Sequence, residues 1–180
     1  MAKKSRVRRR HVVKTALLIV GEGPDDQAFV KHMNRVFRED SPGIRASINK
    51  ESGGSPGNVI ANTTRKYKND DYDHRFIVLD SDIPIDATSR QLAEKHGYAI
   101  ILWEPQCLEG ALLDVLGEPI QSAETSQNLK ARLHPMLDAH HTEPEAYASR
   151  FPKPVLTDAT NSSIVSVRKA LTGRKKTDGQ

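Results

Sequence analysis

The chain has 180 residues, a net charge of +4 and a hydrophobic fraction of 37%. This length supports one domain with a substantial core and is short for two, and the low apolar content predicts that part of the chain, chiefly its ends, is solvated. The single cysteine, Cys107, excludes an intramolecular disulfide and a cysteine-based zinc site. We therefore expect a cytoplasmic protein, and no apolar run approaches the roughly 18 residues of a membrane span.

Positive charge is concentrated towards both ends of the chain. The residues concerned are Lys3, Lys4, Arg6, Arg8, Arg9 and Arg10 at one end and Arg168, Lys169, Arg174, Lys175 and Lys176 at the other. Such clusters favour polyanions, because Lys and Arg contact phosphates and release counterions. Solvated, disordered ends explain the same runs equally well. Nucleic acid is thus the partner that the charge pattern favours.

From residue 15 to residue 103, short apolar runs alternate with longer amphipathic segments. We predict strands over 15–20, 44–50, 74–80 and 98–103, with helices over 24–40, 58–69 and 84–97 between them. The strand over 74–80 is nearly continuous in apolar residues, as expected of a strand covered on both faces. This order predicts an α/β fold, with a Rossmann-like parallel sheet of about four strands flanked by helices and joined by right-handed crossovers.

After Trp103 the pattern predicts helices without further strands. A short buried helix is expected over 105–117, a longer one over 125–141 and a last amphipathic helix over 161–173. The segment 140–160 carries three prolines and is predicted to be a loop or a partly ordered connection that could move. The resulting division is a basic tail at 1–13, a domain at 14–117, a helical extension of that domain at 118–172 and a tail at 173–180.

Carboxylates follow two of the predicted strands. Glu22 comes directly after the first strand, and Asp80 and Asp82 lie at the end of the third. In open parallel sheets the ligand site lies at the carboxyl ends of the strands, so these side chains are expected to meet at one edge. Their mutual repulsion would be offset by a divalent cation, and an all-oxygen ligand set suits Mg²⁺ or Mn²⁺ better than zinc. Taken alone, Asp-Ser-Asp after a strand is also ordinary turn composition.

Other polar residues have simpler explanations. Asp25 and Asp26 lie in the first turn of a predicted helix, where the macrodipole favours negative charge, so capping explains them more readily than chemistry does. His134, His140 and His141 could act as acids or bind phosphate, but adjacent histidines at a helix end are more often surface residues.

Two segments resemble the motifs of Toprim domains. The stretch LLIVGEGPDD is similar to the first motif, a strand followed by Glu-Gly with an aspartate four residues after the glutamate, and FIVLDSD is similar to the Asp-x-Asp motif of a later strand. The order LIVGEG, GGSPGNVI, FIVLDSD, WEPQCLEGALL further resembles the RloB-like proteins of bacterial restriction and defence loci. The resemblance covers residues 15–117.

This resemblance implies a Toprim fold that binds Mg²⁺ or Mn²⁺ and hydrolyses phosphodiester bonds of DNA or RNA, in a phage-defence or restriction-associated system. It makes Glu22 the acid–base carboxylate and a metal ligand together with Asp80 and Asp82. Asp26 matches the aspartate of the first motif, and Glu109 would complete the acidic edge, although Glu109 is equally explained as the start of a helix. The metal chemistry agrees, since a cation can polarise a phosphoryl oxygen and activate water.

Two alternatives stay open at this point. A haloacid-dehalogenase-type phosphatase also places Asp-x-Asp at a strand end, but it would need a later strand ending in an acidic pair, and the strand over 98–103 runs into Glu-Pro-Gln. The other alternative is a non-catalytic Toprim-like module that binds nucleic acid or docks on a partner protein, such as an ATPase or another defence subunit. Retention of Glu22, Asp80 and Asp82 argues against an inactive site.

Overall fold

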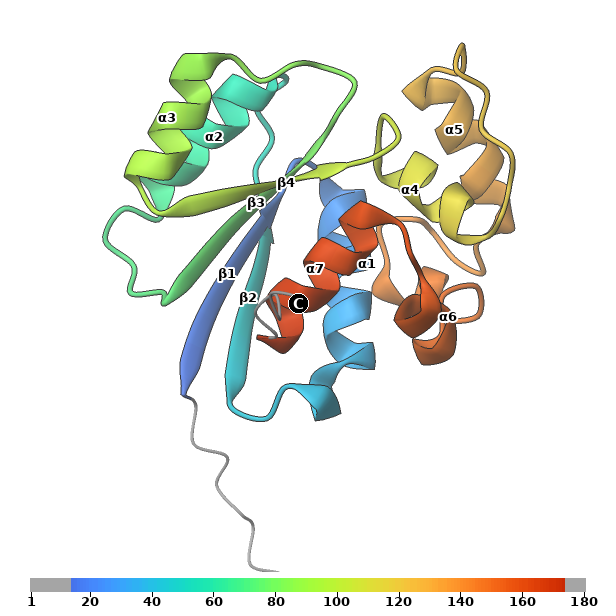
Figure 1. Ribbon diagram of the computed structural model, residues 1–180, viewed down its shortest axis with the longest axis horizontal. Coiled ribbons are helices and arrows are strands. Elements are labelled where there is room, and N and C mark those ends of the chain that lie inside the picture. The colour runs from blue at the N-terminus through green and yellow to red at the C-terminus, as the bar shows by residue number, and fades with distance from the viewer. Residues whose placement is uncertain (1–13, 174–180) are drawn as a thin grey trace, which may run out of the picture.

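The computed structural model describes residues 14–173, which form an α/β fold around a four-stranded parallel sheet (Figure 1). The strands are β1 (Thr15–Gly21), β2 (Ile44–Lys50), β3 (His74–Asp80) and β4 (Tyr98–Trp103). The α-helices are α1 (Pro24–Val36), α2 (Pro56–Lys66), α3 (Ala87–Lys95), α4 (Leu108–Val115), α5 (Ser126–Leu133), α6 (Lys153–Asp158) and α7 (Ser162–Thr172). The predicted fold class is confirmed, including the additional helices after the sheet.

Both faces of the sheet are buried. Successive side chains of a strand point to opposite faces, so Leu17 and Ile19 join one buried cluster while Leu18 and Val20 join the other. Helices α2 and α3 cover one face, and α1 and α7 cover the other (Figure 1). Burial on both sides explains the uninterrupted apolar runs that predicted these strands.

The order of the strands in the sheet creates a crevice at one edge. The spatial order is β2-β1-β3-β4, so the chain adds β2 on one side of β1 and then β3 on the other. Ligands of open α/β sheets bind at such a reversal of strand order, outside the carboxyl ends of the two strands. Here these strands are β1 and β3. Glu22 directly follows β1, and Asp80 is the last residue of β3.

Every predicted helix is shorter in the structure, and two of them end well before their predicted ends. The helix predicted over 24–40 ends at Val36 and is followed by the 3-10 helix η1 (Arg38–Asp40). The helix predicted over 125–141 ends at Leu133 and continues only as the 3-10 helix η2 (His134–Met136). Pro135 explains this end, because it lacks the N–H that a continuing α-helix requires.

The connection over 140–160 is more ordered than the sequence predicts. It contains the 3-10 helix η3 (Pro144–Tyr147) and the helix α6, each with a proline in its first turn. Proline is well tolerated there, because the first helical N–H groups have no partner within the helix. Tyr147 and Phe151 are almost completely buried, and their rings pack against Phe29 with centroids 5.2 and 5.8 Å away. This aromatic contact fixes the connection on α1.

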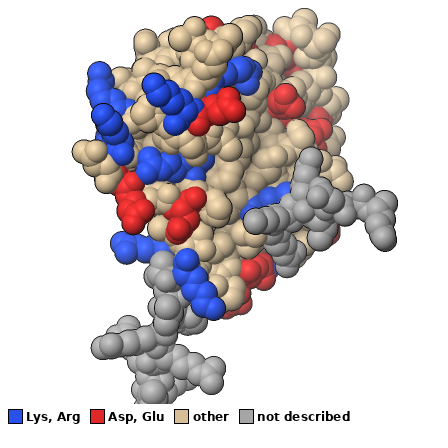
Figure 2. All heavy atoms as spheres, turned by 60° about the vertical axis from the view of Figure 1, so that its left-hand side comes forward, with Lys and Arg blue, Asp and Glu red and all other residues tan. Residues whose placement is uncertain are grey.

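Most of the basic residues near the chain ends lie outside the described residues. Arg168 and Lys169 are the exceptions, and both belong to α7. The Arg168 guanidinium donates hydrogen bonds to the carbonyls of Leu156 and Thr157, so it joins α7 to α6. On the side of the molecule shown in Figure 2, Lys and Arg side chains lie interspersed with Asp and Glu. Among residues 14–173, no helix has the length and apolar character needed to cross a membrane.

Candidate functional site

An acidic pocket of about 150 Å³ lies at the crevice between the ends of β1 and β3. It is lined by Glu22, Gly23, Pro24, Asp25, Asp26, Asp80, Leu108, Glu109 and Lys130. The carboxylates come from the β1–α1 turn, the first turn of α1, the end of β3 and the first turn of α4, and the lysine comes from α5. Four of the five predicted site residues thus meet in this acidic pocket, and Asp82 lies outside its lining.

The glycines around Glu22 allow the β1–α1 turn to pass close to the helix. A Cβ atom on Gly21 would lie 2.5 Å from the Cβ of Asp26, so a larger residue at this position would push α1 away. Gly23 is the N-cap of α1, and its N–H donates to Asp26 Oδ2 at 2.7 Å. The turn places the Glu22 carboxylate against the end of β3, where it accepts a hydrogen bond from the Asp80 N–H at 3.2 Å.

Asp26 anchors this turn with both of its carboxylate oxygens. Besides the bond from Gly23, Oδ1 accepts a hydrogen bond from the indole N–H of Trp103 at 2.6 Å, and Trp103 is fully buried at the end of β4. Burial, followed by the charge of Asp80, raises the pKa of Asp26 well above its usual range. Asp26 therefore caps the N-terminus of α1, as the sequence predicted. It also lines the acidic pocket, where the resemblance to the first Toprim motif places it.

Replacement of Asp26 by asparagine is expected to lower the free energy of unfolding by about 1–3 kcal/mol, although the two side chains have the same shape. The amide would turn its NH₂ group towards one of two donors, the Gly23 N–H or the Trp103 indole. Urea denaturation at pH 7 measures the change. The matched control is Asp86→Asn at the N-cap of α3, where asparagine caps as well as aspartate does. Equal effects of the two substitutions would contradict the anchoring role of Asp26.

The acidic pocket carries an excess of negative charge around Asp80. Burial raises the pKa of Asp80 to about 7, and the neighbouring Glu22 and Glu109 carboxylates add to the shift. Glu109 is only 2% exposed. Burial lowers the pKa of Lys130, but the charges of Glu109 and Asp80 outweigh this and raise it above its usual value. Lys130 therefore offsets part of the repulsion as an ammonium ion.

Asp82 lies in the turn that follows β3. The backbone N–H groups of Ser81 and Asp82 both donate to the carbonyl of Gln106, at 2.8 and 3.0 Å, and Gln106 itself has a left-handed φ of +64°. The Asp82 side chain is exposed and accepts a hydrogen bond from the Ser126 hydroxyl at 2.7 Å. The two aspartates of the Asp-x-Asp motif therefore do not present their carboxylates to the acidic pocket together.

A cluster of one aspartate and two histidines adjoins the acidic pocket. His141 Nδ1 lies 2.8 Å from Asp25 Oδ1, and His134 Nε2 lies 3.9 Å from Asp25 Oδ2. The two imidazole rings stack with centroids 4.0 Å apart and planes 6° apart. One ligand atom from each residue lies within 4.8 Å of the other two, so this Asp25–His134–His141 cluster could hold a metal ion.

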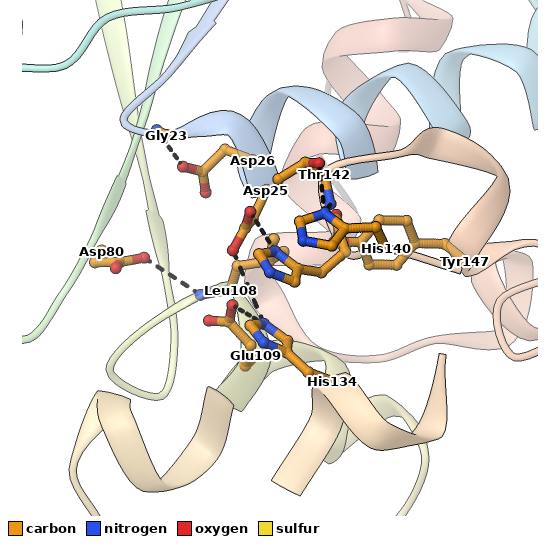
Figure 3. A network of polar contacts seen from close by, with 11 residues as sticks. Gly23, Asp25, Asp26, Asp80, Leu108, Glu109, His134, His140, Thr142 and Tyr147 are labelled. Carbon is orange, nitrogen blue, oxygen red and sulfur yellow. Dashed lines mark hydrogen bonds and ion pairs between the residues drawn. The ribbon is translucent and has the colours of Figure 1, made fainter. Parts of the chain in front are cut away.

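Figure 3 shows Asp25, Glu109 and His134 pointing towards one another between α1 and α4. Glu109 Oε1 lies 3.2 Å from the same Nε2 atom of His134, so Glu109 connects the cluster to the acidic pocket. The expectation that all three histidines are surface residues holds for His140, which is exposed, but His134 and His141 are partly buried. Sequence reasoning missed this cluster.

Cys107 and Tyr147 are both buried and lie outside the lining of the acidic pocket. Cys107 is buried at the N-cap of α4, and burial raises the pKa of its thiol to about 12, so it stays protonated at neutral pH. Tyr147 is buried, and its hydroxyl donates to the carbonyl of His141 at 2.6 Å. Within the described residues, the lining of the acidic pocket includes neither cysteine nor tyrosine.

A scan against protein-family models, a search of curated proteins and a search of solved structures found no match to this chain. The chemistry of the site is therefore inferred from its own side chains.

Proposed function

We propose that this protein is a metal-dependent nuclease that hydrolyses phosphodiester bonds of DNA or RNA at the acidic pocket. The observation that carries the proposal is the convergence of Glu22, Asp80 and Glu109 at the switch point of the sheet. Burial raises the pKa of Asp80 to about 7, and repulsion by the Glu22 and Glu109 carboxylates adds to the shift. A bound divalent cation would offset that repulsion.

The donor atoms of the acidic pocket fit Mg²⁺ or Mn²⁺. Both ions prefer oxygen ligands, and Glu22, Asp80 and Glu109 would hold the ion through their carboxylates. Asp82 would join them only by releasing the Ser126 hydroxyl. A bound ion supplies polarisation of the phosphoryl oxygen and a lower pKa for water.

The side chains of the pocket have complementary roles in this reaction. Glu22 accepts a hydrogen bond from the Asp80 N–H and borders the pocket, so it is placed to take a proton from the attacking water. Lys130 remains charged beside Glu109 and Asp80 and is placed to balance the charge that develops on the phosphate. Asp26 positions Glu22 by fixing the turn. The resemblance to RloB-like proteins supports a role in phage defence beside a partner protein such as an ATPase.

Cleavage of a panel of tRNA, single-stranded DNA and plasmid DNA by the full chain tests the proposal. We expect cutting of at least one substrate with Mg²⁺ or Mn²⁺ and none with EDTA. Glu22→Gln should slow cutting by about 10²–10⁴-fold, because it removes both the proton acceptor and one of the proposed metal ligands.

Cutting that persists in EDTA or in Glu22→Gln would contradict the assigned site. Substrate binding without any cutting would instead favour a non-catalytic module that binds nucleic acid.

A further inference from the structure

We propose that Asp25, His134 and His141 bind a borderline transition-metal ion of the Zn²⁺ class, at a site next to the acidic pocket. Two imidazole nitrogens and one carboxylate oxygen form a ligand set that suits zinc, whereas Mg²⁺ prefers oxygen ligands alone. The chemistry of this cluster therefore differs from that of the all-carboxylate set of Glu22, Asp80 and Glu109. The proposal does not depend on the nuclease activity proposed above.

The spacing of the three side chains is close to what a tetrahedral ion needs. With metal–ligand bonds of about 2.0–2.1 Å, the ligand atoms of a tetrahedral zinc site lie roughly 3.4 Å apart. His141 Nδ1 lies 2.8 Å from Asp25 Oδ1, and His134 Nε2 lies 3.9 Å from the other oxygen, Oδ2, while one ligand atom from each side chain lies within 4.8 Å of the other two. The two imidazole planes are only 6° apart, and a ring nitrogen binds a metal in the plane of its ring, so one of the rings must rotate out of the stack for both nitrogens to face the same ion.

Three separate segments position the ligands. Asp25 belongs to the first turn of α1, His134 begins η2, and His141 lies in the connection that follows. The hydroxyl of Tyr147 donates to the His141 carbonyl at 2.6 Å, and Tyr147 is itself locked in the aromatic contact with Phe29. The folded chain thus holds these side chains together before any ion arrives.

The cluster is accessible to an ion and to a further ligand. The side chains of Asp25, His134 and His141 are 17%, 26% and 28% exposed. Three protein ligands with access to solvent leave the fourth position of a tetrahedral ion for water or substrate, as in catalytic zinc sites. Glu109 Oε1 lies 3.2 Å from His134 Nε2, so an ion bound at this nitrogen would replace that contact and add positive charge beside the acidic pocket.

A simple hydrogen-bonded and stacked pair of histidines is the competing explanation, and metal titration separates the two. We expect the metal-free full chain to bind Zn²⁺ in isothermal titration calorimetry and to develop the visible absorption of low-coordinate Co²⁺ when Co²⁺ is added. His134→Ala, His141→Ala and the isosteric Asp25→Asn should each weaken Zn²⁺ binding by more than the about 10–100-fold typical for loss of an outer-shell partner.

The matched control is His140→Ala. His140 is exposed, is the neighbour of His141 in sequence, stacks on it with centroids 4.2 Å apart and lies outside the ligand set. This variant should bind Zn²⁺ as the wild type does, and so should Asp80→Asn, which alters only the acidic pocket. Circular dichroism verifies that each variant is folded. The proposal is overturned if the wild type does not bind Zn²⁺, if the ligand variants bind it unchanged, or if His140→Ala loses as much affinity as they do.

Discussion

Asp80→Asn is expected to lower metal-dependent cleavage by about 10²–10³-fold or more, whereas Asp82→Asn should retain most of the activity. Asp80 lines the acidic pocket between Glu22 and the N-terminus of α4, where its Oδ1 accepts a hydrogen bond from the Leu108 N–H at 3.3 Å. Asp82 is exposed and bonded to Ser126. Both substitutions convert a carboxylate into an amide, so a difference in activity between them reports only where each aspartate lies.

The comparison is best made by titrating Mg²⁺ in the cleavage assay for each variant. Loss of a metal ligand should raise the Mg²⁺ concentration needed for half-maximal activity, and we expect this shift for Asp80→Asn only. Ser126→Ala is a useful companion, because it releases Asp82 without altering any carboxylate. Equal loss of activity in both aspartate variants would show that the Asp-x-Asp pair acts as a unit, as the Toprim resemblance implies, and that the turn after β3 rearranges around the ion.

The sheet and its acidic edge were predictable because each depends on local sequence. The run from Phe76 to Leu79 is apolar throughout and Asp80 follows it, so the strand and its end are visible without knowledge of the fold. Once the strands were expected to be parallel, a general rule placed Glu22 and Asp80 at the same edge. The close approach of Gly21 to Asp26 also has a local cause, because it occurs within one turn.

The remainder depended on contacts between distant segments. His134 and His141 meet Asp25 only because Pro135 ends α5 and the aromatic contact of Tyr147 with Phe29 draws the following connection back onto α1. Neither event is visible in the spacing of the histidines. The orientation of the Asp82 side chain could not be predicted for the same reason. The carbonyl of Gln106, in the loop after β4, accepts hydrogen bonds from the Ser81 and Asp82 N–H groups and so fixes the chain after Asp80.

The second large effect concerns stability. In the metal-free protein, the part of the free energy of unfolding that depends on Asp80 is expected to fall as the pH rises from about 4 to about 7. The folded protein keeps the Asp80 proton up to pH about 7, whereas an unfolded aspartate loses it near 3.8. Between these values the folded state binds more protons than the unfolded state, so raising the pH favours unfolding. This contribution is fully present below pH 3.8 and is lost by the time the pH passes about 7.

The size of the effect follows from the difference between the two pKa values. A shift of roughly 3 pKa units at 1.36 kcal/mol each gives at most about 4 kcal/mol. Asp80→Asn removes the ionisation, and its amide oxygen can still accept the Leu108 N–H. We therefore expect this variant to gain stability over the wild type as the pH rises from 5 to 8, with each kcal/mol raising the melting temperature by about 2–4 °C.

Thermal unfolding of both proteins in EDTA across this pH range measures the difference. The difference between the two proteins isolates Asp80, because Asp26 and the other carboxylates are common to both. If the melting temperatures of the two proteins change in parallel with pH, burial and neighbouring charge do not raise the pKa of Asp80 as proposed. Mg²⁺ should reverse the order at pH 8, because the ion requires the ionised carboxylate that destabilises the metal-free fold. The same residue would then limit stability without the ion and provide its binding energy with it, which is the trade-off expected of a site built for a cation.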